Sequence, residues 1–261
     1  MLMTKPVAKP EEAVEQLIGE QFTEWLMEYI FLKIHDEPEM SLIKTAKPKI
    51  EKLRKFLLQL FLTDEAFVGG AEGDPGFLRF AIANLSESND PQAEGALNIL
   101  EKRRQEELLG HKVEKGIIWT RSRELWIKLF KALGLTPEEV NRTESKEWTR
   151  NYISEISDLL SNADWQVAAG VFTVFERAIP EEYKAVINLL RNNSQISDQD
   201  LEVLTKRVNM YDQYAKESMH ILEKIVFDPQ SKQLIWEGVS KHLEARREFY
   251  SGNIKYLEAT T

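Results

Sequence analysis

The sequence has no cysteine in its 261 residues, so it can form no disulfide bond and offers no thiol nucleophile. Histidine is scarce as well, at four residues. The longest apolar run, FLLQLFL at 56–62, falls far short of the ~20 residues that cross a bilayer, and it carries Gln59 in its middle. These absences exclude cysteine-based catalysis and leave no predicted membrane span.

Positive charge is also in deficit, because 34 Lys and Arg face 43 Asp and Glu, for a formal net charge of −9. Such a surplus of negative charge repels the phosphates of nucleic acids and of anionic lipids. We therefore expect no nucleic-acid partner and no membrane partner. The N-terminal stretch MLMTKPVAKPEEAVEQL lacks the apolar core of a secretory signal, which together with the absence of cysteine predicts a cytoplasmic protein.

Apolar residues recur at helical spacing along most of the chain, with no strand alternation and no internal repeat. The pattern predicts an all-α bundle of about eight to ten helices in one domain, residues 1–261, with residues 1–9 as an N-terminal tail. The expected helices cover roughly residues 10–34, a segment ending near 67, 75–87, 91–110, a segment closed by Gly134, one opened by Thr136, 144–161, 164–178, 180–192, 198–227 and 230–257. Such bundles build metal and cofactor sites from inward side chains on facing helices.

Three polar side chains share one face of the helix YDQYAKESMHILEKI. Gln213, Glu217 and His220 stand at the spacing i, i+4, i+7, which places them on a single stripe, and we expect that stripe to be buried. Glu217 and His220 form the Glu-x-x-His element that di-iron bundles use. A histidine among apolar residues is, however, more often a hydrogen-bonded core residue than a metal ligand.

Glu176 lies in WQVAAGVFTVFERAIP, a helix apolar enough to be buried on most sides. A carboxylate in that position needs a cation. The sequence leaves three alternatives open: a metal ion, a salt bridge to an arginine on a neighbouring helix, or a position near solvent just before Pro180.

Further candidates lie in three polar contexts. Glu107 and His111 in EELLGH offer a carboxylate and an imidazole at i, i+4, although taken alone they fit a solvated glutamate near a helix end and an exposed loop histidine. His35 in KIHDE and His242 in SKHLEA are predicted to lie at the surface.

The order of several segments resembles a known superfamily. EELLG, RELWIKLFKALGLTPEEV, VFTVFERAIPEEY, the Glu217-x-x-His220 helix and LEARREFYSGNIKYL look like the haem-oxygenase-like superfamily, in its TenA, PqqC and CADD-like branch with the haem-oxygenase-like di-iron oxidases. The likeness covers roughly residues 75–257. It implies a haem-oxygenase-like multi-helix bundle.

The resemblance also implies a set of metal ligands. Glu107 matches a glutamate late in the family's fourth helix, Glu176 matches the central glutamate, and the family's His-x-x-x-Asp-x-x-His motif falls on Gln213, Glu217 and His220. The motif is degenerate here, since glutamine replaces its first histidine and glutamate replaces its aspartate. A further family histidine falls near Ser122, unless His111 replaces it from the loop.

Two functions of different classes follow. The first is a non-haem iron oxidase or oxygenase, with one or two iron ions or with manganese, that acts with dioxygen on a small organic acid or amine in a buried pocket. Its metal would be bound by Glu107, Glu176, Glu217, His220 and His111, with Gln213 as a neighbouring or vestigial position. The second is a metal-free family member that serves as a small-molecule binding or assembly protein.

Other activities of the superfamily fit less well. Thiaminase-type hydrolysis uses a cysteine nucleophile, haem oxygenation needs a histidine on the first helix, and PqqC-type oxidation relies on several histidines. The resemblance implies a homodimer, which is also the commonest oligomer. We expect the aromatic residues Trp236, Phe249 and Tyr250 in the core rather than at the dimer surface.

Overall fold

The computed structural model describes residues 8–69, 76–109 and 122–258, and within these ranges it leaves out the side chains at 106–109, 122, 220, 221 and 224. The described residues form helices, turns and loops without a strand, so the all-α prediction is confirmed. In this part of the chain no helix is long and apolar enough to cross a membrane.

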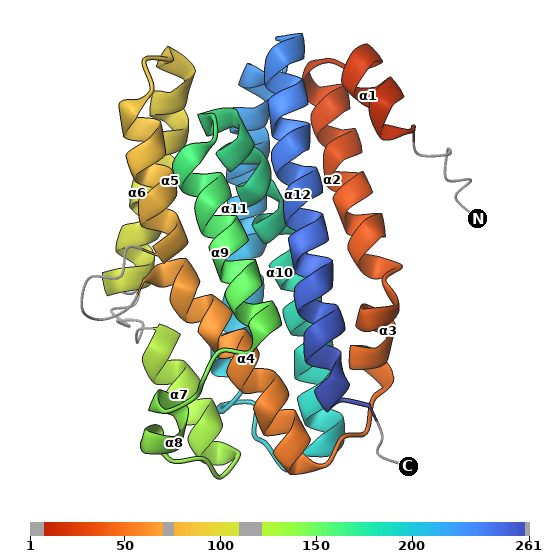
Figure 1. Ribbon diagram of the computed structural model, residues 1–261, viewed down its shortest axis with the longest axis vertical. Helices are drawn as coiled ribbons and strands as arrows, with labels where there is room; N and C mark the ends of the chain where they lie inside the picture. The colour runs from red at the N-terminus through yellow and green to blue at the C-terminus, as the bar shows by residue number, and fades with distance from the viewer. Residues whose placement is uncertain (1–7, 70–75, 110–121, 259–261) are drawn as a thin grey trace.

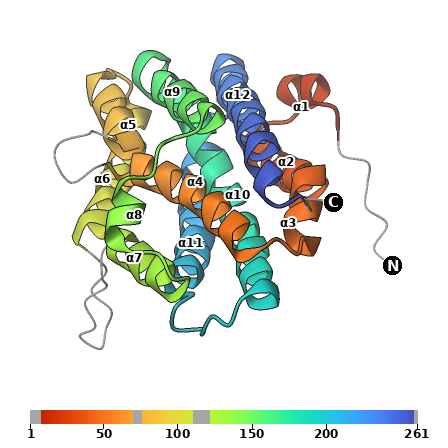
Figure 2. The same ribbon diagram turned by 60° about the horizontal axis from the view of Figure 1, so that its bottom comes forward.

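The helices, in chain order, are α1 (Pro10–Gln16), α2 (Gly19–His35), α3 (Pro38–Thr45), α4 (Ile50–Val68), α5 (Gly76–Glu87), α6 (Pro91–Leu109), α7 (Ser122–Ala132), α8 (Pro137–Asn141), α9 (Glu147–Asn162), α10 (Trp165–Asn193), α11 (Glu202–Ile225) and α12 (Pro229–Asn253), followed by a 3₁₀ turn at Ile254–Tyr256. In Figure 1, α2 and α3 lie on one side of the molecule and α5 and α6 on the other, with α9 and α12 between them. Figure 2 shows the oblique course of α4 across the bundle.

Helix α10 forms the centre of the bundle and contacts α2, α3, α5, α9, α11 and α12. Its apolar sequence explains this position, because a helix that is hydrophobic on most sides is stable only when other helices surround it. Two glycines let α12 approach closely. A Cβ atom at Gly170 would lie 2.2 Å from the Ile235 carbonyl oxygen, and one at Gly238 would lie 2.1 Å from the Val167 carbonyl oxygen.

The described ranges hold twelve α-helices rather than the predicted eight to ten, and α3 begins where the sequence predicts a turn. Two of the other differences have a clear local cause. The helix expected over residues 10–34 is broken after α1, where Gly19 adopts a φ of 51°, a conformation that favours glycine. In contrast, the expected break before Pro180 is wrong, since α10 continues through it. Proline removes only one backbone hydrogen bond from a helix, and here the surrounding helices support a buried proline.

The aromatic core prediction holds for two of its three residues. Phe249 and Tyr250 are each 2% exposed, whereas Trp236 is half-buried beside Trp25 and Tyr29. His35 is exposed, as predicted.

Candidate functional site

Glu176 is buried in the middle of α10 and pairs with an arginine from a neighbouring helix. Its side chain is fully shielded from solvent, and its Oε1 accepts hydrogen bonds from Nη1 of Arg103 on α6 and from the Ser218 hydroxyl on α11, the latter at 2.7 Å. Burial raises the pKa of Glu176, while the charge of Arg103 and the bond from Ser218 oppose the rise. Of the three alternatives for this carboxylate, the structure has the salt bridge.

Arg103 is fixed by several contacts at once. Its Nη2 donates to the Tyr214 carbonyl oxygen at 3.1 Å and to the Ser218 hydroxyl at 2.9 Å, and its guanidinium carbon lies 4.4 Å from the centre of the Tyr214 ring. The residue is 2% exposed. Arg103 therefore acts as a fixed cation between α6, α10 and α11.

The residues of α11 that face Glu176 each follow a residue of the predicted stripe by one position. They are Tyr214 and Ser218, whereas Gln213 is exposed and donates to Glu217 at 3.1 Å. Glu217 is partly exposed and pairs with Lys102 at 3.2 Å. The expectation that Gln213 is buried is wrong, because one residue along a helix turns a side chain by about 100°.

Four of the predicted positions lie outside what the structure describes. His111 falls in an undescribed segment, and the side chains of Glu107, His220 and Ser122 are among those left out. Whether Glu107 and His220 converge with Glu176 on a metal therefore stays a prediction.

The described surroundings of Glu176 suit a guanidinium rather than a metal ion. Arg103 offers no lone pair to a metal and would repel its positive charge. In the described ranges there is also no group of three or more His, Asp or Glu that could hold an ion. These surroundings do not fit iron.

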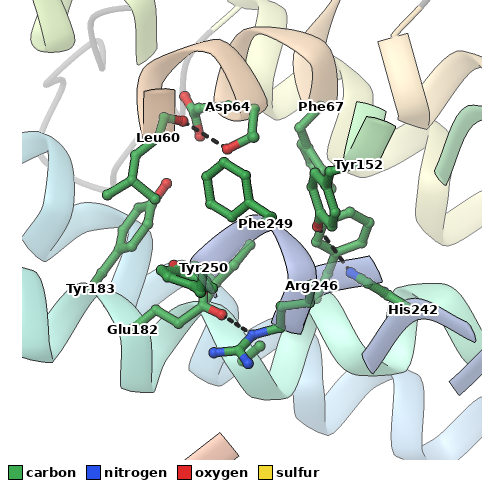
Figure 3. Close-up of a pocket in the computed structure, with 14 residues that line it drawn as sticks. Leu60, Asp64, Phe67, Tyr152, Glu182, Tyr183, His242, Arg246, Phe249 and Tyr250 are labelled. Carbon is green, nitrogen blue, oxygen red and sulfur yellow. Dashed lines mark hydrogen bonds and ion pairs between the residues drawn. The ribbon is translucent and has the colours of Figure 1, made fainter. Parts of the chain in front are cut away.

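A second group of polar residues surrounds a cavity of about 40 Å³ between α4, α9, α10 and α12. We call it the tyrosine-lined cavity, because Tyr152, Tyr183 and Tyr250 contribute to its wall. Burial raises the pKa of all three phenols above their usual range, so they are neutral hydroxyl groups at neutral pH. Figure 3 shows the Phe249 ring in the middle of the cavity, between Asp64 and the Glu182–Arg246 pair.

His242 belongs to this cavity, and its predicted surface position is wrong. The side chain is 1% exposed, with Nδ1 2.8 Å from the Val171 carbonyl oxygen and Nε2 3.0 Å from the Tyr152 hydroxyl. A carbonyl can only accept, so Nδ1 carries the proton and Nε2 accepts from Tyr152. Burial lowers the pKa of His242 to about 3, so the ring is a neutral, weak base.

Arg246 and Glu182 form the charged wall of the cavity, and Glu37, which does not line it, pairs with the same guanidinium. The Nε of Arg246 pairs with Glu182 of α10, and its Nη1 pairs with Glu37, which directly precedes α3. Burial alone would lower the pKa of Arg246, but the two carboxylates more than offset this and raise it. Burial raises the pKa of Glu37, against the lowering effect of Arg246. This triad combines two carboxylates with one guanidinium.

The remaining charges near the tyrosine-lined cavity are paired. Asp64 accepts from Trp126 Nε1 at 2.9 Å and pairs with Arg207 at 2.8 Å. The carboxylate and the guanidinium neutralise each other, and His242 is uncharged. With both glutamates ionised, the triad as a whole carries a surplus of about one negative charge next to the cavity, which Glu182 and Arg246 line.

Sequence reasoning missed Arg246 and placed His242 at the surface, although the spacing of residues along α12 indicates that both are buried. Val239, His242, Arg246 and Phe249 follow one another at steps of three, four and three residues, which places them on one helix face. Two apolar residues on that face indicate burial of the histidine and the arginine between them. The polar local context SKHLEA concealed this pattern.

The comparisons with known proteins place the chain in a family. Residues 77–249 match the TENA/THI-4/PQQC family. No curated protein sequence is significantly similar to the chain.

Several solved structures share the fold at low sequence identity. A CADD-like protein of unknown function from Nostoc punctiforme PCC 73102 is 12% identical, with a TM-score of 0.71 over 91% of this chain and 99% of that one. A TenA homologue from Pseudomonas syringae pv. tomato DC3000 is 14% identical, with a TM-score of 0.66 over 97% and 98%. A domain with a haem-oxygenase-like fold from Shewanella denitrificans OS217 is 11% identical, with a TM-score of 0.64 over 90% of each chain.

Identities this low show the fold and not the activity. The predicted haem-oxygenase-like bundle is thus confirmed. The match over residues 77–249 identifies the chain as a member of the TENA/THI-4/PQQC family.

Proposed function

We propose that the protein binds a small organic cation, such as a primary amine, in the tyrosine-lined cavity and does so without a metal ion. The observation that carries this proposal is the triad of Glu37, Arg246 and Glu182, in which two carboxylates meet a single buried guanidinium. A buried negative charge without a counter-ion is costly, so the site favours a ligand that brings one positive charge.

The aromatic residues of the cavity suit the same ligand. Phe175, Phe249 and Tyr250 line it, and the electron-rich faces of such rings attract cations. Nη2 of Arg246 has no hydrogen-bond partner among the described residues, and an acceptor atom of a ligand would satisfy it. A small amine that also carries an oxygen acceptor therefore matches both features.

The size of the cavity limits the ligand. A volume of about 40 Å³ corresponds to roughly three water molecules. With Phe249 in its observed position, the ligand has only a few non-hydrogen atoms.

Calorimetric titration with three probes of similar size tests the proposal. Ethylammonium should bind, while ethanol and acetate should bind at least about tenfold more weakly. Glu182→Gln retains the shape of the side chain but removes the surplus charge, and it should weaken ethylammonium binding by about tenfold. The exposed Glu138→Gln on α8 is the matched control. Acetate binding as tight as ethylammonium binding would contradict the proposal.

The iron-dependent oxidase or oxygenase stays a prediction, because Glu107, His111 and His220 lie outside the described side chains. The homodimer is likewise untested, and light scattering at micromolar concentration measures it. A monomer mass would remove the dimer without affecting the cation proposal.

A further inference from the structure

A second cavity lies between α5, α6, α10 and α11, and it is also about 40 Å³ in volume. We call it the α6 cavity. Leu85, Trp165 and Phe172 contribute to its apolar wall, and Arg103 and Ser218 are among its few polar residues. None of its lining residues also lines the tyrosine-lined cavity, so the two cavities are separate.

The lining of the α6 cavity combines a few polar residues with a larger number of apolar ones. Along α10 its lining residues run from Trp165 to Thr173, eight helical steps that span about 12 Å. Thr173 lies one helical turn from Glu176, the partner of Arg103 and Ser218, whereas Trp165 lies at the opposite end of this stretch of α10. A ligand with a polar head and a short apolar tail matches this division.

The charge of Arg103 is already compensated. Arg103 and Glu176 form a one-to-one ion pair, in contrast to the triad around Arg246. A further carboxylate would be repelled by Glu176, and a further ammonium would be repelled by Arg103. Any ion bound there would thus be buried without a partner of its own.

Two polar atoms of this ion pair have no hydrogen-bond partner in the described part of the chain. They are Nε of Arg103, which is a donor, and Oε2 of Glu176, which is an acceptor, and both are fully buried. Buried polar atoms of native proteins are nearly always paired. Arg103 lines the α6 cavity and Glu176 does not, so a head group in the cavity that accepts a hydrogen bond would satisfy Arg103 Nε.

We propose that the α6 cavity binds a short neutral amphiphile with an amide or alcohol head group. The head group accepts a hydrogen bond from Arg103 Nε, and the alkyl tail extends towards Trp165. The small side chains of Ala96 and Ala169 leave the room for the tail.

The test compares three probes that differ mainly in the charge of the head group: butanamide, butanoate and butylammonium. Each probe is titrated into the full chain, and binding is measured by calorimetry and by the NMR signals of the indole groups. Butanamide should bind at least about tenfold more tightly than either ion. Binding of either ion as tight as that of butanamide, or no detectable butanamide binding at its solubility limit, would overturn the proposal.

Cavity-filling variants locate the binding. Ala169→Leu from α10 and Ala96→Leu from α6 each fill the space for the tail and should weaken butanamide binding by at least about tenfold. Circular dichroism shows whether each variant folds. If one variant misfolds, the other, from a different helix, still tests the proposal. The exposed Ala132→Leu on α7 is the matched control. Unchanged butanamide binding by a folded Ala169→Leu or Ala96→Leu would contradict the assignment to this cavity.

Discussion

Two buried arginines pair with glutamates of the central helix, and the two sites differ by one carboxylate. Arg103 compensates Glu176 alone, whereas Arg246 is shared between Glu182 and Glu37. Both arginines are 2% exposed, so burial does not distinguish them. The ratio of carboxylates to guanidinium therefore sets the charge of ligand that each site favours, neutral at Arg103 and cationic at Arg246.

The largest effect is expected from breaking the balanced pair. Arg103→Met leaves the Glu176 carboxylate buried without its cation and should lower the free energy of unfolding by about 3–5 kcal/mol. Denaturant unfolding measures this loss. Lys102→Met, which removes the partly exposed pair with Glu217, should cost no more than about 1 kcal/mol.

A double variant tests whether the loss of stability comes from the unpaired carboxylate of Glu176. Arg103→Met combined with Glu176→Leu removes both charges and should recover most of the loss. An Arg103→Met protein as stable as the Lys102→Met control would show that Arg103 is not the cation on which Glu176 depends.

The next largest effect should be a loss of stability in acid that arises from His242 in the tyrosine-lined cavity. His242 has an ordinary pKa of 6.5, which burial lowers to about 3 in the folded protein. Between these values the unfolded chain binds more protons than the folded one, so stability is fully present above pH 6.5 and falls as the pH decreases towards 3. The slope should approach about 1.4 kcal/mol per pH unit.

His242→Gln should flatten this part of the stability profile, measured as unfolding free energy against pH. The exposed His35→Gln should leave the profile as it is in the wild-type protein. A slope that persists in His242→Gln would assign the acid sensitivity to other groups.

The elements of the fold were largely predictable, because helical periodicity survives local irregularity. Pro180 and Gly19 show where helical periodicity does not predict the helix boundaries. Proline predicts a break that the packing around α10 overrides, and the bend at Gly19 depends on a backbone conformation that composition does not reveal.

The site was predictable only in part. The apolar surroundings of Glu176 correctly predicted a buried carboxylate that needs a cation. They could not select Arg103 from the run Lys102, Arg103 and Arg104, because the choice depends on the rotation of α6 against α10. For the same reason the rotation of α11 could not be predicted, and Tyr214 and Ser218 face Glu176 in place of the predicted stripe.

A smaller effect concerns the pH dependence of cation binding. The pKa of Glu37 lies above its ordinary value of 4.5 because of burial, with Arg246 opposing the rise. Ethylammonium should bind the ionised carboxylate better, so its affinity should increase a few-fold as the pH rises through that titration. Calorimetry at a series of pH values measures the change, and Glu37→Gln should remove it. A wild-type affinity independent of pH would contradict the role of Glu37.

Anaerobic Fe(II) titration tests most directly whether Arg103 stands in the place of a metal ion. Followed by oxygen exposure and optical spectroscopy, it should give equal and negligible iron binding for the wild-type protein and His220→Ala, and Gln213→His should bind no better, because Gln213 is exposed. Stoichiometric Fe(II) binding by the wild-type protein that is lost in His220→Ala would contradict the account and support the iron-dependent oxidase.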